Sequence, residues 1–204
     1  MKLDEEMAEF CGVICGDGNI WTNGRKYEIT ITGNPKDKEY LDKIANYVSD
    51  NIKPTVYYRI RGRGLRLTVY SKELFRYLTE VIGFGIGTDK NLNGIPRSIL
   101  KNRKLELPFI RGVFDTDGSF FISDKKGALG YPTIEITNEN IELLVQIKDI
   151  LREEGFRVTF RKSNKNTFKT AIHGKRMLEL WLQRIGSSHP RKLANMESII
   201  KTMD

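Results

Sequence analysis

The 204-residue chain repeats itself at a spacing of about 100 residues. Phe10–Gly18 reads FCGVICGDG and Ile110–Gly118 reads IRGVFDTDG, and further along the offset becomes 103, where Val69–Lys72 matches Ile172–Lys175. A unit of this length is too long for a solenoid repeat, which spans about 20–50 residues. The chain is therefore expected to fold as two similar halves related by a pseudo-twofold axis, like a symmetric dimer fused into one polypeptide.

Helical and strand periodicities alternate within each half. Apolar residues recur at helical spacing over 7–14, whereas apolar and polar residues alternate over 27–32, and Asn23-Gly24 predicts a tight hairpin turn. The predicted elements after the helix ending at 17 are strands 19–22 and 27–32, helix 40–48, strands 55–60 and 65–70, and helix 74–82. After the helix ending at 117 they are strands 119–124 and 133–137, helix 140–154, strands 156–162 and 167–173, and helix 175–185.

The predicted fold class is α+β, with two pseudo-symmetric αββαββα half-domains. Each half is expected to be a four-stranded antiparallel sheet backed by helices, and the halves are expected to pack through their first helices. The predicted boundaries are 1–90 for the first half, 91–105 for a connector and 106–204 for the second half. The connector is placed there because Asn93-Gly94 and Ile95-Pro96 break the regular pattern.

A stripe of small residues marks the first helix of each half. It consists of Ala8, Gly12 and Gly16 in the first copy and of Pro108, Gly112 and Thr116 in the second. Small residues four apart let two helix backbones approach closely, so Gly12 and Gly112 are predicted to form the helix interface.

If these helices pack together, Asp17 and Asp117 meet at one end. Two carboxylates and the carbonyls of two helix C-termini make an oxygen-rich site suited to Mg²⁺. A single Asp-Gly is usually a turn, but its occurrence after two matching helices favours a shared site. Such a site serves phosphoryl chemistry by activating water and stabilising the leaving oxygen.

Two other metal sites are disfavoured. The segment 115–118 lacks the residues that complete an EF-hand calcium loop. Cys11 and Cys15 have no further ligand nearby for zinc and are poorly placed for a disulfide, so both are interpreted as small buried apolar residues.

The net charge of +8 favours a polyanionic partner such as nucleic acid. No apolar run approaches the roughly 20 residues that cross a bilayer, and the first residues are too acidic for a signal peptide. An intracellular, non-secreted protein without a membrane partner is expected.

Phe10–Gly18 and Ile110–Gly118 resemble the paired motifs of the LAGLIDADG homing endonucleases in their single-chain, double-motif form. The archaeal intron-encoded type is the most similar. Both segments have Gly at the third, Asp at the eighth and Gly at the ninth motif position. The first copy departs from the pattern at Cys15, where the second copy keeps the acid Asp115, and we assign Asp115 a supporting role.

The resemblance implies that Asp17 and Asp117 bind a divalent metal, Mg²⁺ or Mn²⁺, together with the scissile phosphates. The carbonyls of Gly16 and Thr116 are plausible further ligands. The basic residues Lys90 and Lys192 match positions after the last helix of each half and would assist catalysis by stabilising developing charge or orienting water. For either lysine, a solvated surface charge is the alternative.

One polar sheet face in each half is predicted to lie along DNA, because its mixture of Arg, Lys, Asn, Thr and Glu suits hydrogen bonding to base edges. A solvated face of an antiparallel sheet is the alternative. The predicted DNA-contacting residues are Trp21, Asn23, Arg25, Lys26, Glu28, Thr30, Thr32, Arg59, Arg61, Arg63, Phe121, Ser123, Lys125, Thr133, Glu135, Thr137, Arg157, Thr159 and Arg161.

The function expected from this resemblance is that of a monomeric, site-specific homing endonuclease. It would make a metal-dependent double-strand cut in a long, partly asymmetric DNA target and leave short 3′ overhangs. Two alternatives use the same scaffold: an RNA maturase that binds intron RNA and assists splicing, and a non-cleaving sequence-specific DNA-binding protein. The presence of both acids favours the nuclease.

Overall fold

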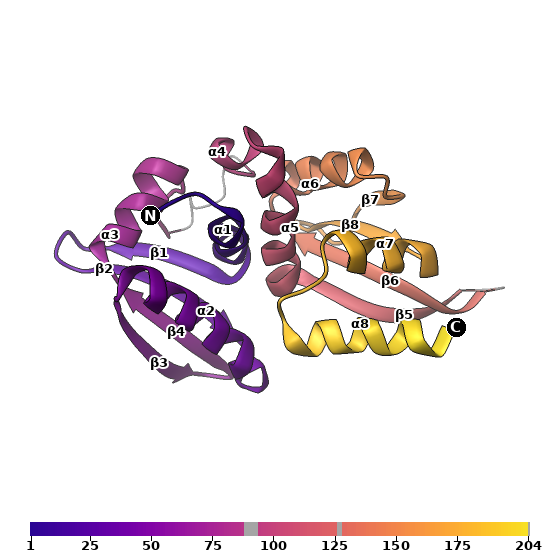
Figure 1. Cartoon of the computed structure of the whole chain (residues 1–204), viewed down its shortest axis with the longest axis horizontal. Helices are drawn as coiled ribbons and strands as arrows, with labels where there is room; N and C mark the ends of the chain where they lie inside the picture. The colour runs from indigo at the N-terminus through magenta and orange to yellow at the C-terminus, as the bar shows by residue number, and fades with distance from the viewer. Residues whose placement is uncertain (88–93, 126–127, 204) are drawn as a thin grey trace.

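Two halves of similar architecture lie side by side and meet at one central pair of helices (Figure 1). The computed structural model describes residues 1–87, 94–125 and 128–203. In the first half, β1 (Gly18–Thr22), β2 (Tyr27–Gly33), β4 (Gly64–Tyr70) and β3 (Thr55–Arg61) form an antiparallel sheet in the order β1-β2-β4-β3. Its helical elements are α1 (Glu5–Asp17), η1 (Pro35–Asp37), α2 (Lys38–Ile52), α3 (Lys72–Arg76) and η2 (Tyr77–Ile82).

The second sheet repeats this topology. It has the order β5-β6-β8-β7 and consists of β5 (Gly118–Lys125), β6 (Ala128–Asn138), β7 (Val158–Lys162) and β8 (Phe168–His173). The helices are α4 (Arg97–Leu100), α5 (Arg103–Asp117), α6 (Ile141–Glu153), α7 (Lys175–Arg184) and α8 (Pro190–Met203). The predicted α+β class with two four-stranded antiparallel sheets is confirmed.

Three features differ from the sequence-based expectation. The structure contains α4 within the expected connector, and α5 begins at Arg103, where the Asn102 side chain accepts a hydrogen bond from Lys104 N. A further helix, α8, follows α7 and buries Met196 completely. The predicted elements end at residue 185, so α8 was missed.

The core follows from the alternation along the strands. Ile20, Ile29 and Leu67 point to the same face of the first sheet and are fully buried, whereas their neighbours point to the opposite face. Both cysteines of α1 are free and fully buried, as predicted. Within the described residues, no helix combines the length and apolar character that crossing a membrane requires.

The central contact between α1 and α5 is made by backbone. A Cβ atom on Gly12 would overlap the carbonyl oxygen of Phe109 and lie 3.0 Å from the Cα atom of Gly112. A Cβ atom on Gly112 would overlap the carbonyl oxygen of Glu9 and lie 2.9 Å from the nitrogen of Val13. The predicted interface residues Gly12 and Gly112 therefore face each other, with no room for any side chain.

We expect Gly12→Ala and Gly112→Ala each to lower the free energy of unfolding by about 3 kcal/mol, because the added methyl group must push two helix backbones apart. Urea unfolding followed by circular dichroism measures this. Gly33→Ala is the control, since its Cβ atom would lie 3.5 Å from the Leu41 side chain, an ordinary contact. Equal stabilities of Gly12→Ala and Gly33→Ala would contradict the packing argument.

Candidate active site

The two predicted aspartates end the two central helices at the same end of the helix pair. Asp17 is the last residue of α1 and Asp117 is the last residue of α5, and each is followed by the glycine that opens a strand. A Cβ atom on Gly16 would overlap the Thr116 hydroxyl and lie 3.2 Å from the Asp117 carboxyl carbon. The last turn of α1 therefore contacts the last turn of α5, beside the Asp117 carboxylate.

The donors at this end fit a hard divalent cation. They are the oxygens of two carboxylates and the carbonyls that helix C-termini present, including those of Gly16 and Thr116. In the described residues, His, Cys, Asp and Glu form no group of three that could hold a metal. A cation bound by Asp17 and Asp117 would thus complete its coordination with backbone carbonyls, water or a bound phosphate.

Asp117 has a side-chain partner that the sequence did not suggest. Asn138, the last residue of β6, donates a hydrogen bond from Nδ2 to Oδ2 of Asp117 at 2.5 Å. Gly118 pairs with Ile136 and Gly18 pairs with Ile31, so the first-half equivalent of Asn138 is Gly33. The two carboxylates therefore have different surroundings, a difference that aligning the strands of the repeats could have revealed.

Lys192 is held against the C-terminal end of α5. Its Nζ atom donates to the carbonyl oxygens of Phe114, Asp115 and Gly118 at 2.7, 3.0 and 2.6 Å. Burial lowers the pKa of Lys192 to about 8, against the opposing effect of the carboxylates of Asp115, Asp17 and Asp117. All three ammonium hydrogens are used by carbonyls, so Lys192 offers a fixed positive charge rather than a hydrogen-bond donor to water or phosphate.

Asp115 supports this same segment from inside the protein. It is almost fully buried, and its carboxylate accepts hydrogen bonds from the Ser187 hydroxyl and from Ser188 N, the latter at 2.8 Å. Desolvation raises the pKa of Asp115 to about 6, although both hydrogen bonds and Lys192 oppose the rise. Its first-half equivalent, Cys15, is fully buried.

The segment that carries Lys192 also contacts the first half. Arg191 binds both carboxylate oxygens of Asp37, at 2.9 and 3.0 Å, and His189 Nε2 lies 3.5 Å from the same carboxylate. The Arg191 guanidinium holds the pKa of Asp37 below its usual value. The start of α8 is therefore tied to the α1–α2 half by charge-assisted hydrogen bonds.

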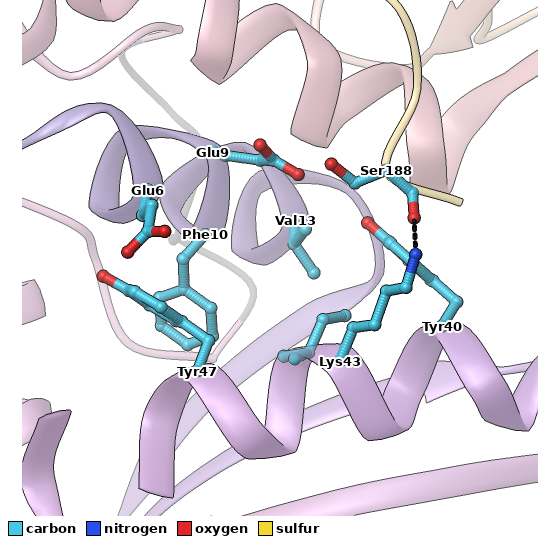
Figure 2. Close-up of a pocket in the computed structure, with 9 residues that line it drawn as sticks. Glu6, Glu9, Phe10, Val13, Tyr40, Lys43, Tyr47 and Ser188 are labelled. Carbon is cyan, nitrogen blue, oxygen red and sulfur yellow. Dashed lines mark hydrogen bonds between the residues drawn. The ribbon is translucent and has the colours of Figure 1, made fainter. Parts of the chain in front are cut away.

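Two further contacts strengthen this cross-half connection. The Tyr40 ring stacks on the His189 ring with centroids 4.8 Å apart. Lys43 Nζ donates to the Ser188 carbonyl oxygen at 3.3 Å (Figure 2). Next to these contacts lies a cavity of about 290 Å³, lined by residues of both halves that include Asp17, Asp115 and Lys192. The cross-half connection thus lies at the aspartate end of the helix pair.

The polar face of the first sheet carries most of its predicted DNA contacts. Trp21 is exposed on β1, Glu28 pairs with Tyr70, and Thr32 pairs with Arg66, which in turn pairs with Arg59 of β3. Arg61 ends β3 and Arg63 lies in the β3–β4 turn, whereas Asn23, Arg25 and Lys26 lie in the β1–β2 turn.

In the second sheet, the equivalent face includes residues of all four strands. Phe121 pairs with Thr133, which pairs with His173, and Arg161 pairs with Lys169. The other predicted residues of this half are Ser123 on β5, Glu135 and Thr137 on β6, Thr159 on β7 and Arg157 just before β7.

Several predicted contacts need correction. Thr30 and Thr133 are only 3% and 2% exposed and Glu135 is 9% exposed, because neighbouring side chains cover the middle of each face. Thr133 contacts His173 Nδ1 at 3.1 Å, and Glu135 pairs with Lys169 at 3.0 Å. As arranged, these three side chains are not open to a ligand.

Other predicted residues are engaged locally or lie outside the described residues. The Asn23 side chain accepts hydrogen bonds from Arg25 N and Lys26 N, so it shapes its own turn. Lys90 and the side chain of Lys125 lie outside the described part of the chain.

The prediction also missed polar-face residues on the inner strands β4 and β8, one from each sheet. These are Arg66, Tyr70, Lys169 and His173, together with Tyr57 on β3. The strand alternation could have identified them, because each lies two residues from a neighbour on the same face.

Comparison with known proteins finds a similarity to one family model within the second half. Residues 104–186 match the family model described as a LAGLIDADG-like domain. The chain as a whole shares its fold with the homing endonuclease I-DmoI, whose mesophilic variants superpose with a TM-score of 0.70 at 23% identity over 95% of this chain and 97% of that chain.

Two other solved structures are also similar over nearly the full length of this chain. The I-LtrWI LAGLIDADG homing endonuclease bound to target DNA gives a TM-score of 0.65 at 18% identity, covering 99% of this chain and 91% of that chain. Full-length DUF199/WhiA from Thermatoga maritima gives 0.60 at 18% identity, covering 98% of this chain and 61% of that chain. The expected fold of two pseudo-symmetric halves is therefore confirmed.

Two curated relatives come from Methanocaldococcus jannaschii. A replication factor C small subunit is 27% identical over 201 residues, which are 97% of this chain but 10% of the relative. An uncharacterized protein is 25% identical over 182 residues, 83% of this chain and 62% of the relative. The chain thus spans a tenth of the first relative and less than two thirds of the second.

The buried Asp115 predicts a specific dependence of stability on pH. Its folded-state pKa of about 6 lies above the ordinary value of 3.8, so the folded protein binds the proton more tightly. Protonated Asp115 therefore stabilises the fold by about 3 kcal/mol below pH 4. This stabilisation is lost as the pH rises through about 6. Urea unfolding of the wild type and Asp115→Asn from pH 3.5 to 7.5 measures the difference, and parallel pH profiles would refute it.

Proposed function

We propose that this chain is a site-specific homing endonuclease that makes a metal-dependent double-strand cut in DNA. The observation that carries the proposal is the pair of aspartates, one from each repeat, at the contacting ends of α1 and α5. Each aspartate is followed directly by a strand whose sheet has a polar face. The similar enzyme I-DmoI is known in complex with DNA and Mn, which supports both the ligand and the use of a divalent cation.

Asp17 and Asp117 would hold the cation, with the carbonyls of Gly16 and Thr116 as further ligands. A bound Mg²⁺ or Mn²⁺ would supply a polarised water and charge stabilisation at the leaving oxygen. Asn138 fixes the orientation of the Asp117 carboxylate through its 2.5 Å hydrogen bond. Lys192 offsets the negative end of α5, which lowers the repulsion between the carboxylates and an approaching phosphate.

The two polar faces would read a long target in the major groove, with exposed residues such as Arg59 and Arg61 on one side and Arg161 on the other. Because the two residue sets differ, the target would be only partly symmetric. We further propose that the enzyme acts as a monomer inside the cell, that it leaves short 3′ overhangs, and that 1–90 and 106–204 act as half-domains joined by 91–105.

Asp17→Asn and Asp117→Asn are each expected to lower double-strand cutting at least about a hundredfold, since an amide binds the cation less well than a carboxylate. Linear product from a randomised plasmid library, with and without Mg²⁺, measures the activity. Glu5→Gln, at an exposed acid in the first turn of α1, is the control for charge loss. The proposed mechanism would be refuted if the Asp17→Asn/Asp117→Asn double variant still cut DNA. A wild type that binds DNA without cutting it would indicate a non-cleaving DNA-binding protein.

The unequal surroundings of the two carboxylates predict unequal nicking of the two strands at limiting Mg²⁺. Asp117 has the Asn138 amide and the neighbouring Asp115, whereas the first half has Gly33 and Cys15 in their places. Strand-specific labels on a target recovered from the library measure the ratio of the two nicks. Asn138→Gly copies the first half and should change this ratio toward equality, and equal nicking by the wild type would contradict the prediction.

A further inference from the structure

A strongly basic cavity lies at the end of the second sheet, away from the aspartates. It has a volume of about 660 Å³ and is lined by the cations Arg152, Arg157, Lys175 and Arg176, which we call the basic rim. Among the described residues, no Asp or Glu lines this cavity. Four positive charges gathered around one hollow favour an anionic ligand.

Three different elements position these cations. Arg152 lies in the last turn of α6, where Nη2 donates to the Val158 carbonyl oxygen at 3.4 Å. Arg157 directly precedes β7, and Lys175 and Arg176 open α7. The buried residues Phe156 and Met177 also line the cavity, and Arg157 N contacts Met177 Sδ at 3.2 Å. The basic rim is therefore anchored in the core of the second half.

The basic rim is continuous with the polar face that we propose for DNA. Thr159 and His173 of that face line the same cavity, and Thr159 Oγ1 lies 3.3 Å from His173 Nε2. His173 pairs with Thr133, which pairs with Phe121, three residues beyond Gly118. At about 3.3 Å per residue, the rim begins about 10 Å or more along the strands from the aspartate end.

The first half shows what the rim looks like without these charges. Lys53 and Gly155 both have left-handed φ values after α2 and α6, so they are equivalent positions. An offset of 102 at this point makes Asp50 the equivalent of Arg152 and Thr55 the equivalent of Arg157. At the offset of 103 that follows, Lys72 matches Lys175 and Glu73 matches Arg176. Four cations in the second half thus replace one cation, one neutral residue and two acids in the first.

We propose that the basic rim binds backbone phosphates of the DNA that flanks the base pairs covered by the second sheet. The inference rests on the proposed function, because DNA is the ligand in both. Arginine forks match phosphate oxygens in a bidentate way, and such contacts position a duplex without reading its sequence. The equivalent surface of the first half, with Asp50 and Glu73, repels a phosphate, so the enzyme holds the two flanks of its target unequally.

The test compares DNA affinities at different salt concentrations. The probe is a fluorescein-labelled, random-sequence 40-base-pair duplex, and binding is followed by fluorescence anisotropy in EDTA from about 50 to 300 mM KCl, so that no cutting occurs. Each lost phosphate contact reduces the slope of log K against log[salt] by about 0.9. We expect the variant Arg152→Gln/Arg157→Gln/Arg176→Gln to lose about two to three units of slope and to bind at least about tenfold more weakly at low salt.

Arg97→Gln/Lys101→Gln/Lys104→Gln is the matched control. It removes the same charge from three exposed positions: Arg97 opens α4, Lys101 directly follows α4, and Lys104 lies in the first turn of α5. These positions lie at the end of the helix pair opposite Asp117 (Figure 1). This control is expected to keep the wild-type slope to within about one unit. Equal slopes for the rim variant and the wild type would overturn the proposal for the basic rim. The proposed nuclease function would still stand if the wild type binds and cuts DNA. A wild type that does not bind the duplex would overturn both.

A gain-of-function variant separates the loss of phosphate contacts from misfolding of the rim variant, because a misfolded protein would not bind DNA more strongly. Asp50→Arg/Thr55→Arg/Glu73→Arg transplants the rim residues into the first half and should increase the slope by about two to three units. On a target recovered from the library, shortening the flank beside the second half should weaken wild-type binding, whereas shortening the other flank should not. The transplanted variant should become sensitive to both flanks, and an unchanged slope in this variant would count against the proposal.

Discussion

The contact between Gly12 and Gly112 is the constraint on which the rest of the structure depends. At this point two helix backbones touch, because a Cβ atom on either residue would overlap a carbonyl oxygen of the other helix. One turn further along, a Cβ atom on Gly16 would overlap the Thr116 side chain and lie 3.2 Å from the Asp117 carboxyl carbon. The close approach therefore determines how near the two helix ends lie, and with them the two aspartates. A wider spacing filled by larger side chains would leave the same fold but two separate carboxylates.

Bringing two carboxylates to the C-terminal ends of two helices is electrostatically unfavourable in itself, because helix dipoles add negative charge there. The chain offsets part of this cost with its own residues. Lys192 binds three carbonyls at the end of α5, and Asn138 donates to Asp117. The remaining charge favours a cation. The segment that supplies Lys192 also binds Asp37 of the first half through Arg191, so the same few residues neutralise the site and connect the halves.

The sequence predicted what depends on local periodicity and on the repeat: both sheets, the glycine contact and the position of Asp17 and Asp117. It did not predict Asn138, because the partner of a carboxylate 21 residues away depends on strand register. It also could not show that the Lys192 ammonium donates to three carbonyl oxygens, because those contacts depend on how α8 packs against the end of α5. Thr30 and Thr133 show a third limit: alternation gives the face of a strand residue but not how far its neighbours cover it.

Fusion of two copies into one chain removes the requirement that both halves carry the same residues. In a true symmetric dimer, equivalent positions carry the same residue, so pairs that differ, such as Gly33 and Asn138 or Asp50 and Arg152, could not occur. Here the glycine contact, which needs the same small residue from both helices, has kept its symmetry. The differences are found where each half acts alone: around its own carboxylate, on its own sheet face and at its own rim. Symmetry is thus retained at the axis and lost with distance from it, which is the pattern expected if the helix pair defines the fold and the periphery defines the ligand.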